Sequence, residues 1–245
     1  MGRDATQKAN WMDGRPVRVM AYKIPAEPMK ADNWKPEILS EELHVVHNFW
    51  PFTQPGRKKP MSIITGSYEG YSAIILGEGG KKHQTNLVHE GNQNNEKSNR
   101  GASEIKSGWL KEGAAVVATI EPWHGNEVVA YTGKKGAKPT RTVLDDHLRW
   151  GHAVSFGDFT GEGDDLVIGV RDNPTKDDKF TEKRGVRIYR NTEGKGTTWE
   201  RYILEDGGVA VEDLAVGDIN GDGKPDIVAV GRATGNCRIY WNQGK

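Results

Sequence analysis

The stretch Asp218-Ile-Asn-Gly-Asp-Gly-Lys-Pro-Asp226 places oxygen-bearing side chains at alternate positions between two apolar segments. Its glycines allow the backbone to fold these oxygens round one centre, and hard oxygen ligands suit Ca²⁺. An EF-hand is excluded, because the position of its bidentate glutamate is Ala229 and the flanking segments resemble strands. We therefore predict a strand hairpin that binds Ca²⁺, with a metal-free Asx-rich turn as the alternative. The predicted ligands are Asp218, Asn220, Asp222 and Asp226.

A second copy of this hairpin begins at Asp158, 60 residues earlier, and is one residue shorter. Each copy follows an apolar segment and precedes two more, which gives the order strand, acidic hairpin, strand, turn, strand. The shorter copy has Thr and Glu at ligand positions, so we expect weaker Ca²⁺ binding there. Its acidic ligands would be Asp158, Glu162 and Asp165.

The same order of strands continues upstream with less acidic loops. Four antiparallel strands repeated radially form a propeller blade. We therefore predict an all-β propeller of about four and a half blades in one domain, residues 1–245, with the polar segment 81–99 as a surface loop. A piece of a larger propeller, closure by strand sharing and closure by oligomerisation remain open. The units cover residues 17–43 (an outer half-blade), 44–100, 101–146, 147–204 and 205–245.

Composition argues against two classes of partner. The 34 Lys and Arg residues balance 34 Asp and Glu residues without a basic run, so we expect no nucleic-acid partner. No apolar stretch approaches the roughly 18 residues of a membrane span, and the first seven residues have no apolar core of signal-peptide length. The compartment is therefore not encoded. Cys237 is the only cysteine, which excludes an internal disulfide.

The acidic hairpin resembles that of the FG-GAP or VCBS repeat β-propellers. The phrases His47-Asn-Phe-Trp-Pro and Ile120-Glu-Pro-Trp-His-Gly-Asn are similar to secreted bacterial members and to the propeller domain of the aldos-2-ulose dehydratases. The resemblance covers nearly the whole chain and implies the later blades of a seven-bladed ring, extracellular or periplasmic relatives and carbohydrate chemistry. The chain departs from it at Gly235, where many relatives have a histidine, and the dehydratase's cupin domains have no counterpart in these residues.

Blade geometry predicts a second site at the opposite end from the acidic hairpins. Inner strands start at the face where second strands end, so residues at these places meet round one mouth of the central channel. Imidazoles and carboxylates there can bind a metal or move a proton, and arginines can hold an oxyanion. The predicted catalytic residues are His47, His124, His152, Glu104 and Arg232, and the predicted substrate-binding residues are Tyr68, Glu69, Trp123, Arg171 and Glu212.

These residues, together with the family resemblance, favour a carbohydrate-active propeller, namely a metal-assisted dehydratase or lyase that acts on a keto-sugar. The expected cofactors are structural Ca²⁺ and a second divalent metal at the channel mouth. The expected partner is a small molecule or oligosaccharide, with neither nucleic acid nor membrane, and a homo-oligomer would be one way to complete the ring. The alternative is a non-catalytic propeller that binds glycans or proteins, or an incomplete scaffold.

Overall fold

The structure is a computed structural model that describes residues 14–30, 32, 34–79, 81–94, 99–134, 136–176 and 179–244. Within these ranges the secondary structure is entirely β, with strands in five antiparallel sheets. The described residues include no helix that could cross a bilayer.

Three sheets have the four-strand order of a propeller blade, because each strand pairs with the next along the chain. The first blade is β3 (Asn48–Phe52), β4 (Ser62–Ser67), β5 (Gly70–Ile75) and β6 (Gln84–His89). The second is β7 (Ile105–Trp109), β8 (Ala115–Glu121), β9 (Glu127–Thr132) and β10 (Thr140–Asp145). The third is β11 (Gly151–Gly157), β12 (Asp165–Val170), β13 (Gly185–Asn191) and β14 (Trp199–Asp206).

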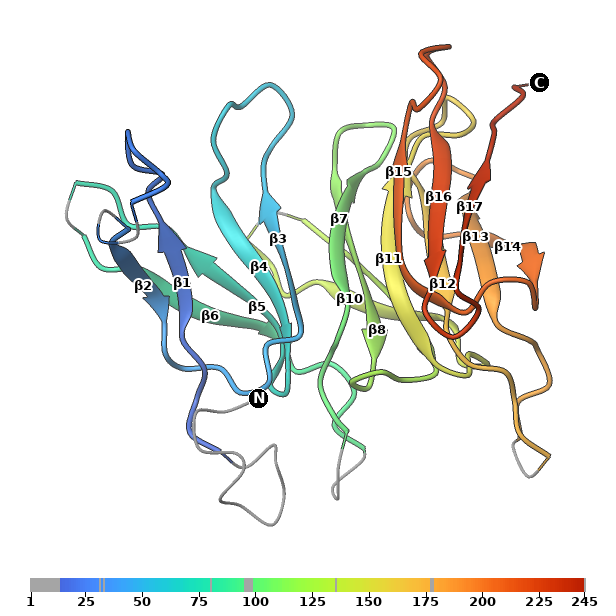
Figure 1. Cartoon of the computed structure of the whole chain (residues 1–245), viewed down its shortest axis with the longest axis horizontal. Coiled ribbons are helices and arrows are strands. Elements are labelled where there is room, and N and C mark those ends of the chain that lie inside the picture. The colour runs from blue at the N-terminus through green and yellow to red at the C-terminus, as the bar shows by residue number, and fades with distance from the viewer. Residues whose placement is uncertain are drawn as a thin grey trace.

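Two smaller sheets flank these blades. A three-stranded sheet contains β15 (Val211–Gly217), β16 (Asp226–Gly231) and β17 (Asn236–Tyr240), and a two-stranded sheet contains β1 (Val19–Tyr22) and β2 (Pro36–Ser40). The sheets follow one another in chain order, from the blue β1–β2 pair to the red β15–β17 sheet (Figure 1). Their inner strands β3, β7, β11 and β15 contact one another in sequence. The predicted all-β partial propeller of about four blades is confirmed.

The core lies between neighbouring sheets. The middle strands β8 and β12 are buried along almost their whole length, whereas the outer strand β14 is mostly exposed. Full burial of an aliphatic side chain contributes about 1.5–3 kcal/mol, so packing between blades is a main source of stability. The three junctions between β3 and β17 have apolar clusters, which contain Ile64 and Ile105, Ile120 and Ile168, and Val167 and Val211 in turn.

The prediction of a surface loop over residues 81–99 was wrong in part. Residues Gln84–His89 form β6, which pairs with β5 as the outermost strand of the first blade. An outermost strand needs few apolar residues, because only part of it faces the core. Leu87 is 56% exposed in this strand, which explains why hydrophobic patterning did not reveal it.

Candidate functional site

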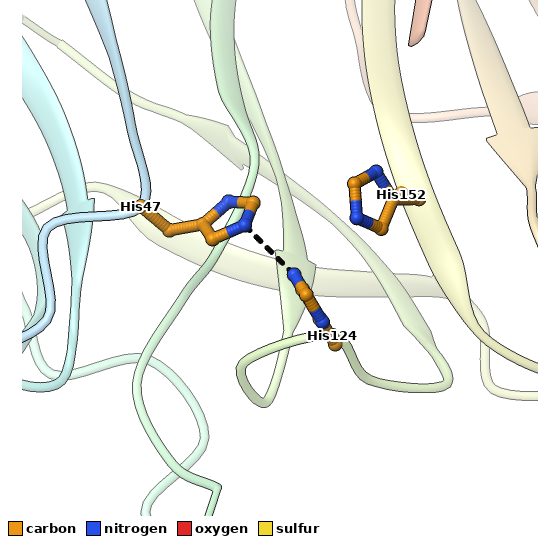
Figure 2. Close-up of side chains that lie close together, drawn as sticks. All are labelled: His47, His124 and His152. Carbon is orange, nitrogen blue, oxygen red and sulfur yellow. Dashed lines mark hydrogen bonds between the residues drawn. The ribbon is translucent and has the colours of Figure 1, made fainter. Parts of the chain in front are cut away.

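Three histidines from three different blades meet at one end of the channel. His47 directly precedes β3, His124 lies in the turn between β8 and β9, and His152 is the second residue of β11. One ligand atom from each lies within 4.8 Å of the others, and all three residues are half-buried. Figure 2 shows the rings of His47 and His124 in contact and His152 beside them. We call these three residues the histidine cluster.

Neighbouring groups orient two of the three rings. Nδ1 of His152 lies 2.7 Å from the carbonyl oxygen of Glu212, so Nδ1 carries the proton and donates, and Nε2 keeps its lone pair. Nδ1 of His47 lies 2.8 Å from Oε1 of Glu104, although the contact is off the ideal hydrogen-bond direction. Such outer contacts are typical of metal-binding histidines, because they fix the tautomer and raise the basicity of the other nitrogen.

The third ring, His124, is held by its neighbour in the chain. The indole of Trp123 stacks on it with ring centroids 3.9 Å apart and planes 11° apart. The backbone of His124 has φ of +49°, a left-handed conformation that non-glycine residues seldom adopt and that is enriched at functional sites. Nε2 of His124 lies 2.7 Å from Nε2 of His47. The turn therefore directs this imidazole into the cluster.

Burial lowers the pKa of His124 most, and positive charge on His47, His152, Arg171 and Arg232 adds to the effect, so that the pKa is about 3. The ring is therefore neutral at pH 7, with a lone pair that a metal can take. A base with so low a pKa removes protons poorly at neutral pH, because a general base works best when its pKa lies near the working pH. His124 is thus better suited to bind a metal than to act as the base.

The donor set fits a divalent transition metal. Three imidazoles are the protein ligands of several catalytic zinc sites, in which the fourth position stays open. Zinc–nitrogen distances of about 2.0–2.1 Å imply roughly 3.3 Å between nitrogens in a tetrahedral site. In the cluster, Nε2 of His47 and Nε2 of His124 are 2.7 Å apart, and all three ligand nitrogens lie within 4.8 Å of one another, so these separations bracket that value. The three rings could therefore hold such an ion with small rotations.

A chain of polar contacts behind His47 ends at Lys106, a residue that sequence analysis did not select. Glu104 is only 4% exposed, and its Oε2 accepts from Nδ2 of Asn48 at 2.5 Å. Lys106 in turn donates to Oδ1 of Asn48 at 2.7 Å. The sequence did hold a signal for Lys106, because residues two apart on a strand share a face and Lys106 follows Glu104 by two.

The predicted arginines and Glu212 lie round the cluster. Arg232 donates to Oε1 of Glu212 at 3.0 Å, and its side chain is 67% exposed. Arg171 donates to Oδ2 of Asp172 at 3.0 Å. Both guanidinium groups are close enough to lower the pKa of His124. The structure thus brings His47, His124, His152, Glu104, Trp123, Glu212, Arg171 and Arg232 to one region.

Tyr68 and Glu69 lie elsewhere, in the turn between β4 and β5. Glu69 accepts from Nδ1 of His44 at 2.7 Å and from the hydroxyl of Ser67 at 2.8 Å. The guanidinium of Arg100 lies over the ring of Tyr68, 3.8 Å from its centroid. Within the described residues, Tyr68 and Glu69 therefore have His44, Ser67 and Arg100 as side-chain neighbours, and a role for them in substrate binding stays a prediction.

The acidic hairpins lie at the other end of their blades (Figure 1). They follow the inner strands β11 and β15, whereas His47 directly precedes β3 and His152 lies at the start of β11. In the longer hairpin Oδ1 of Asp218 accepts from the amides of Gly221 and Asp222, and Oδ2 accepts from Gly223. Gly221 and Gly223 have φ near +80°, at 79° and 82°. This is the geometry of the Asx-rich turn given above as the alternative.

The shorter hairpin has the same backbone shape, since Gly161 and Gly163 have φ of 82° and 92°. Asp165 and Asp226 also have corresponding partners. Asp165 accepts a hydrogen bond from the amide of Asn191, which ends the third strand of its sheet. Asp226 accepts one from the amide of Asn242, which follows the third strand of its own sheet. The carboxylates of neither hairpin form a group of three within 4.8 Å in the described part of the chain. Calcium binding at either hairpin stays a prediction.

Comparison with known proteins assigns the family. A profile of the aldos-2-ulose dehydratase β-propeller domain matches residues 7–134, which is more than half of the chain. The chain belongs to this family. An FG-GAP-like repeat matches residues 164–229, which include the longer acidic hairpin. The propeller is therefore related to a domain of a sugar-processing enzyme. None of the curated proteins compared matches the chain.

Two solved structures are similar to the chain, and the first has the higher TM-score. A candidate 6-phosphogluconolactonase from Bacteroides uniformis has a TM-score of 0.56 at 14% identity, over 93% of this chain and 64% of that one. A lectin from Agrocybe aegerita that recognises non-reducing terminal N-acetylglucosamine has a TM-score of 0.47 at 19% identity, over 87% of this chain and 56% of that one. The chain thus spans less than two thirds of the length of either structure.

Proposed function

We propose that the histidine cluster is the metal site of a dehydratase or lyase that acts on a keto-sugar. The observation that carries the proposal is the convergence of His47, His124 and His152, with ligand atoms within 4.8 Å and two rings oriented by outer contacts. The family assignment supports it, because the family is named after a dehydratase of an aldos-2-ulose.

Elimination of water from a keto-sugar begins with loss of a proton from the carbon beside the carbonyl. A divalent metal bound by the cluster would polarise that carbonyl and so acidify the adjacent carbon–hydrogen bond. The chain must also supply a group that accepts the proton and groups that stabilise negative charge on the carbonyl oxygen.

Glu212 is the better proton acceptor of the two carboxylates beside the cluster. Its side chain is 31% exposed, whereas that of Glu104 is 6% exposed and engaged with Asn48. The backbone of Glu212 also contacts His152, which places the residue at the cluster. Arg171 and Arg232 are the cations that would stabilise the oxyanion, since both already influence His124 electrostatically.

The test is incubation of the protein with 1,5-anhydrofructose or 3-keto-glycosides and zinc, with the ultraviolet absorbance of an unsaturated ketone as the readout. Wild type and His83→Ala should produce the signal, because His83 bonds Glu37 outside the cluster. His124→Ala and Glu212→Gln should lose it. No signal from wild type, or an equal signal from His124→Ala, would contradict the proposal.

The same experiment tests the non-catalytic alternative. A glycan-binding propeller would bind zinc and sugar without forming the ketone, so calorimetry of sugar binding should accompany the absorbance assay. Binding without turnover across the whole set of keto-sugars would favour the alternative over the lyase.

A further inference from the structure

A cavity of about 600 Å³ lies beside the first blade, apart from the residues of the histidine cluster. Its walls include Tyr68 and Glu69 from the β4–β5 turn, Leu87 from β6, Glu90 just after β6, and Arg100 shortly before β7. Ligand pockets for small molecules typically measure about 300–1,000 Å³. The cavity is therefore large enough for a monosaccharide residue.

Among the described residues of this cavity, Arg100 is a charged group without an ion-pair partner. Its guanidinium carbon lies over the Tyr68 ring, 3.8 Å from the centroid, and its Nε is buried with no hydrogen-bond partner in the described part of the chain. Arginine stays charged at all physiological pH values, and a buried donor without an acceptor costs about 1–3 kcal/mol. This side chain therefore favours an anionic acceptor.

The other charged groups of the cavity already have partners. Both oxygens of Glu69 accept hydrogen bonds, from the amide and Nδ1 of His44 and from the hydroxyl of Ser67, and Glu90 pairs with Lys138 at 3.0 Å. The side chain of Glu90 is nevertheless 52% exposed, so its oxygens remain within reach of hydroxyl donors. The walls thus combine a cation that needs an acceptor with a carboxylate, Glu90, that would accept from hydroxyl groups.

We propose that this cavity binds a sugar that carries a carboxylate, that is, a uronic acid residue. The planar fork of Arg100 matches a carboxylate and can hold it through two parallel hydrogen bonds. The sugar hydroxyls donate to Glu90, and Leu87, which is 56% exposed, gives an apolar surface for the ring. A sulfate has no hydroxyl to donate and brings two negative charges near the carboxylates, whereas a uronate brings one, so sulfate fits less well. The site is independent of catalysis at the histidine cluster.

The test is calorimetric titration of the full chain with glucuronate, glucose, acetate and inorganic sulfate. Glucuronate should bind at least about tenfold more tightly than the other three, because it alone offers both the carboxylate and the hydroxyls. Arg100→Gln should weaken glucuronate binding at least about tenfold, and Arg100→Lys should fall between, because an ammonium group lacks the planar fork. Arg57→Gln, in the exposed β3–β4 connection, is the matched control and should bind as wild type does.

Equal affinity for glucuronate and glucose, or full binding by Arg100→Gln, would overturn the proposal. If acetate or sulfate bound as tightly as glucuronate, the inference that the ligand is a sugar would be overturned. Melting curves of each variant show whether it is folded, and if Arg100→Gln unfolds, the Arg100→Lys comparison decides. Glucuronate binding by His124→Ala should be unchanged, which separates this site from the proposed lyase site.

Discussion

The two ends of the blades are held together in different ways. At the mouth, the contacts join residues far apart in sequence, 77 positions for His47 and His124 and 60 for His152 and Glu212. At the acidic hairpins, Asp218 accepts amides from residues only three to five positions later. The mouth can therefore form only when blades pack together, whereas the hydrogen bonds of Asp218 can form within one blade. The shorter hairpin is intermediate, because Gly163 and Asp164 also pair with Leu110 and Trp109 of the preceding blade. Substitutions at the mouth should change ligand binding, and substitutions at the hairpins should change stability.

The largest effect is expected for His124→Ala. Loss of one of three ligands should weaken zinc binding more than about 100-fold, beyond the 10–100-fold loss typical of outer contacts to a ligand. Titration against a competing chelator measures the affinity, and His83→Ala, which removes a histidine outside the cluster, is the control. Unchanged affinity in His124→Ala would show that the cluster is not a zinc site.

Glu104→Gln should have a smaller effect on the same measurement. The substitution keeps the shape of the side chain and an acceptor for Asn48 but removes the negative charge beside His47. Zinc affinity should fall about 10–100-fold. An equal affinity for zinc in this variant and in wild type would mean that Glu104 only fills space behind the ring.

At the other end of the blades, Asp218→Ala removes an acceptor of three backbone amides. Loss of a comparable capping side chain costs about 1–2 kcal/mol, which lowers Tm by roughly 2–8 °C in a protein of this size. If the hairpin binds Ca²⁺, a chelator should lower the Tm of wild type and leave that of Asp218→Ala unchanged. No response of wild type to the chelator would identify the hairpin as a metal-free turn.

Asp158→Ala should have the smallest effect. Its Oδ1 accepts only from the amides of Thr160 and Gly161, at 3.2 and 2.6 Å. The expected loss is about 1 kcal/mol or less, a shift of Tm by at most roughly 2–4 °C. Thermal denaturation of the two single variants side by side gives the comparison. A loss equal to that of Asp218→Ala would show that the two hairpins contribute alike despite their different sequences.

Local patterns predicted most of the fold. The repeated acidic hairpin at Asp158 and Asp218 and the alternation in strands such as β11 and β15 depend on neighbouring residues, so they can be read from the sequence. The histidine cluster could also be predicted, because the blade order alone places His47, His124 and His152 at the same end of the channel. The strand β6 could not be predicted from the sequence, since its outer position leaves its side chains without an apolar pattern.

The parts that sequence reasoning missed depend on packing between segments. Tyr68 lies in the turn after the second strand of its blade, as predicted, but its contact with Arg100 could not be predicted. Arg100 carries no pattern of its own, because its role comes from Tyr68, which belongs to another part of the chain. Strand order predicts which end of a blade a residue occupies, but it does not predict side-chain partners.

The stacking of Trp123 on His124 gives the cluster an optical signal of its own. Indole fluorescence responds to charge and polarity at its ring face, and that face lies 3.9 Å from the imidazole. An ion or sugar that binds at His124 should therefore change the emission of this tryptophan. The chain has 8 tryptophans, so the spectrum of Trp123→Phe, subtracted from that of wild type, isolates the contribution. Occupancy of the mouth could then be followed in solution without a labelled ligand or a known substrate.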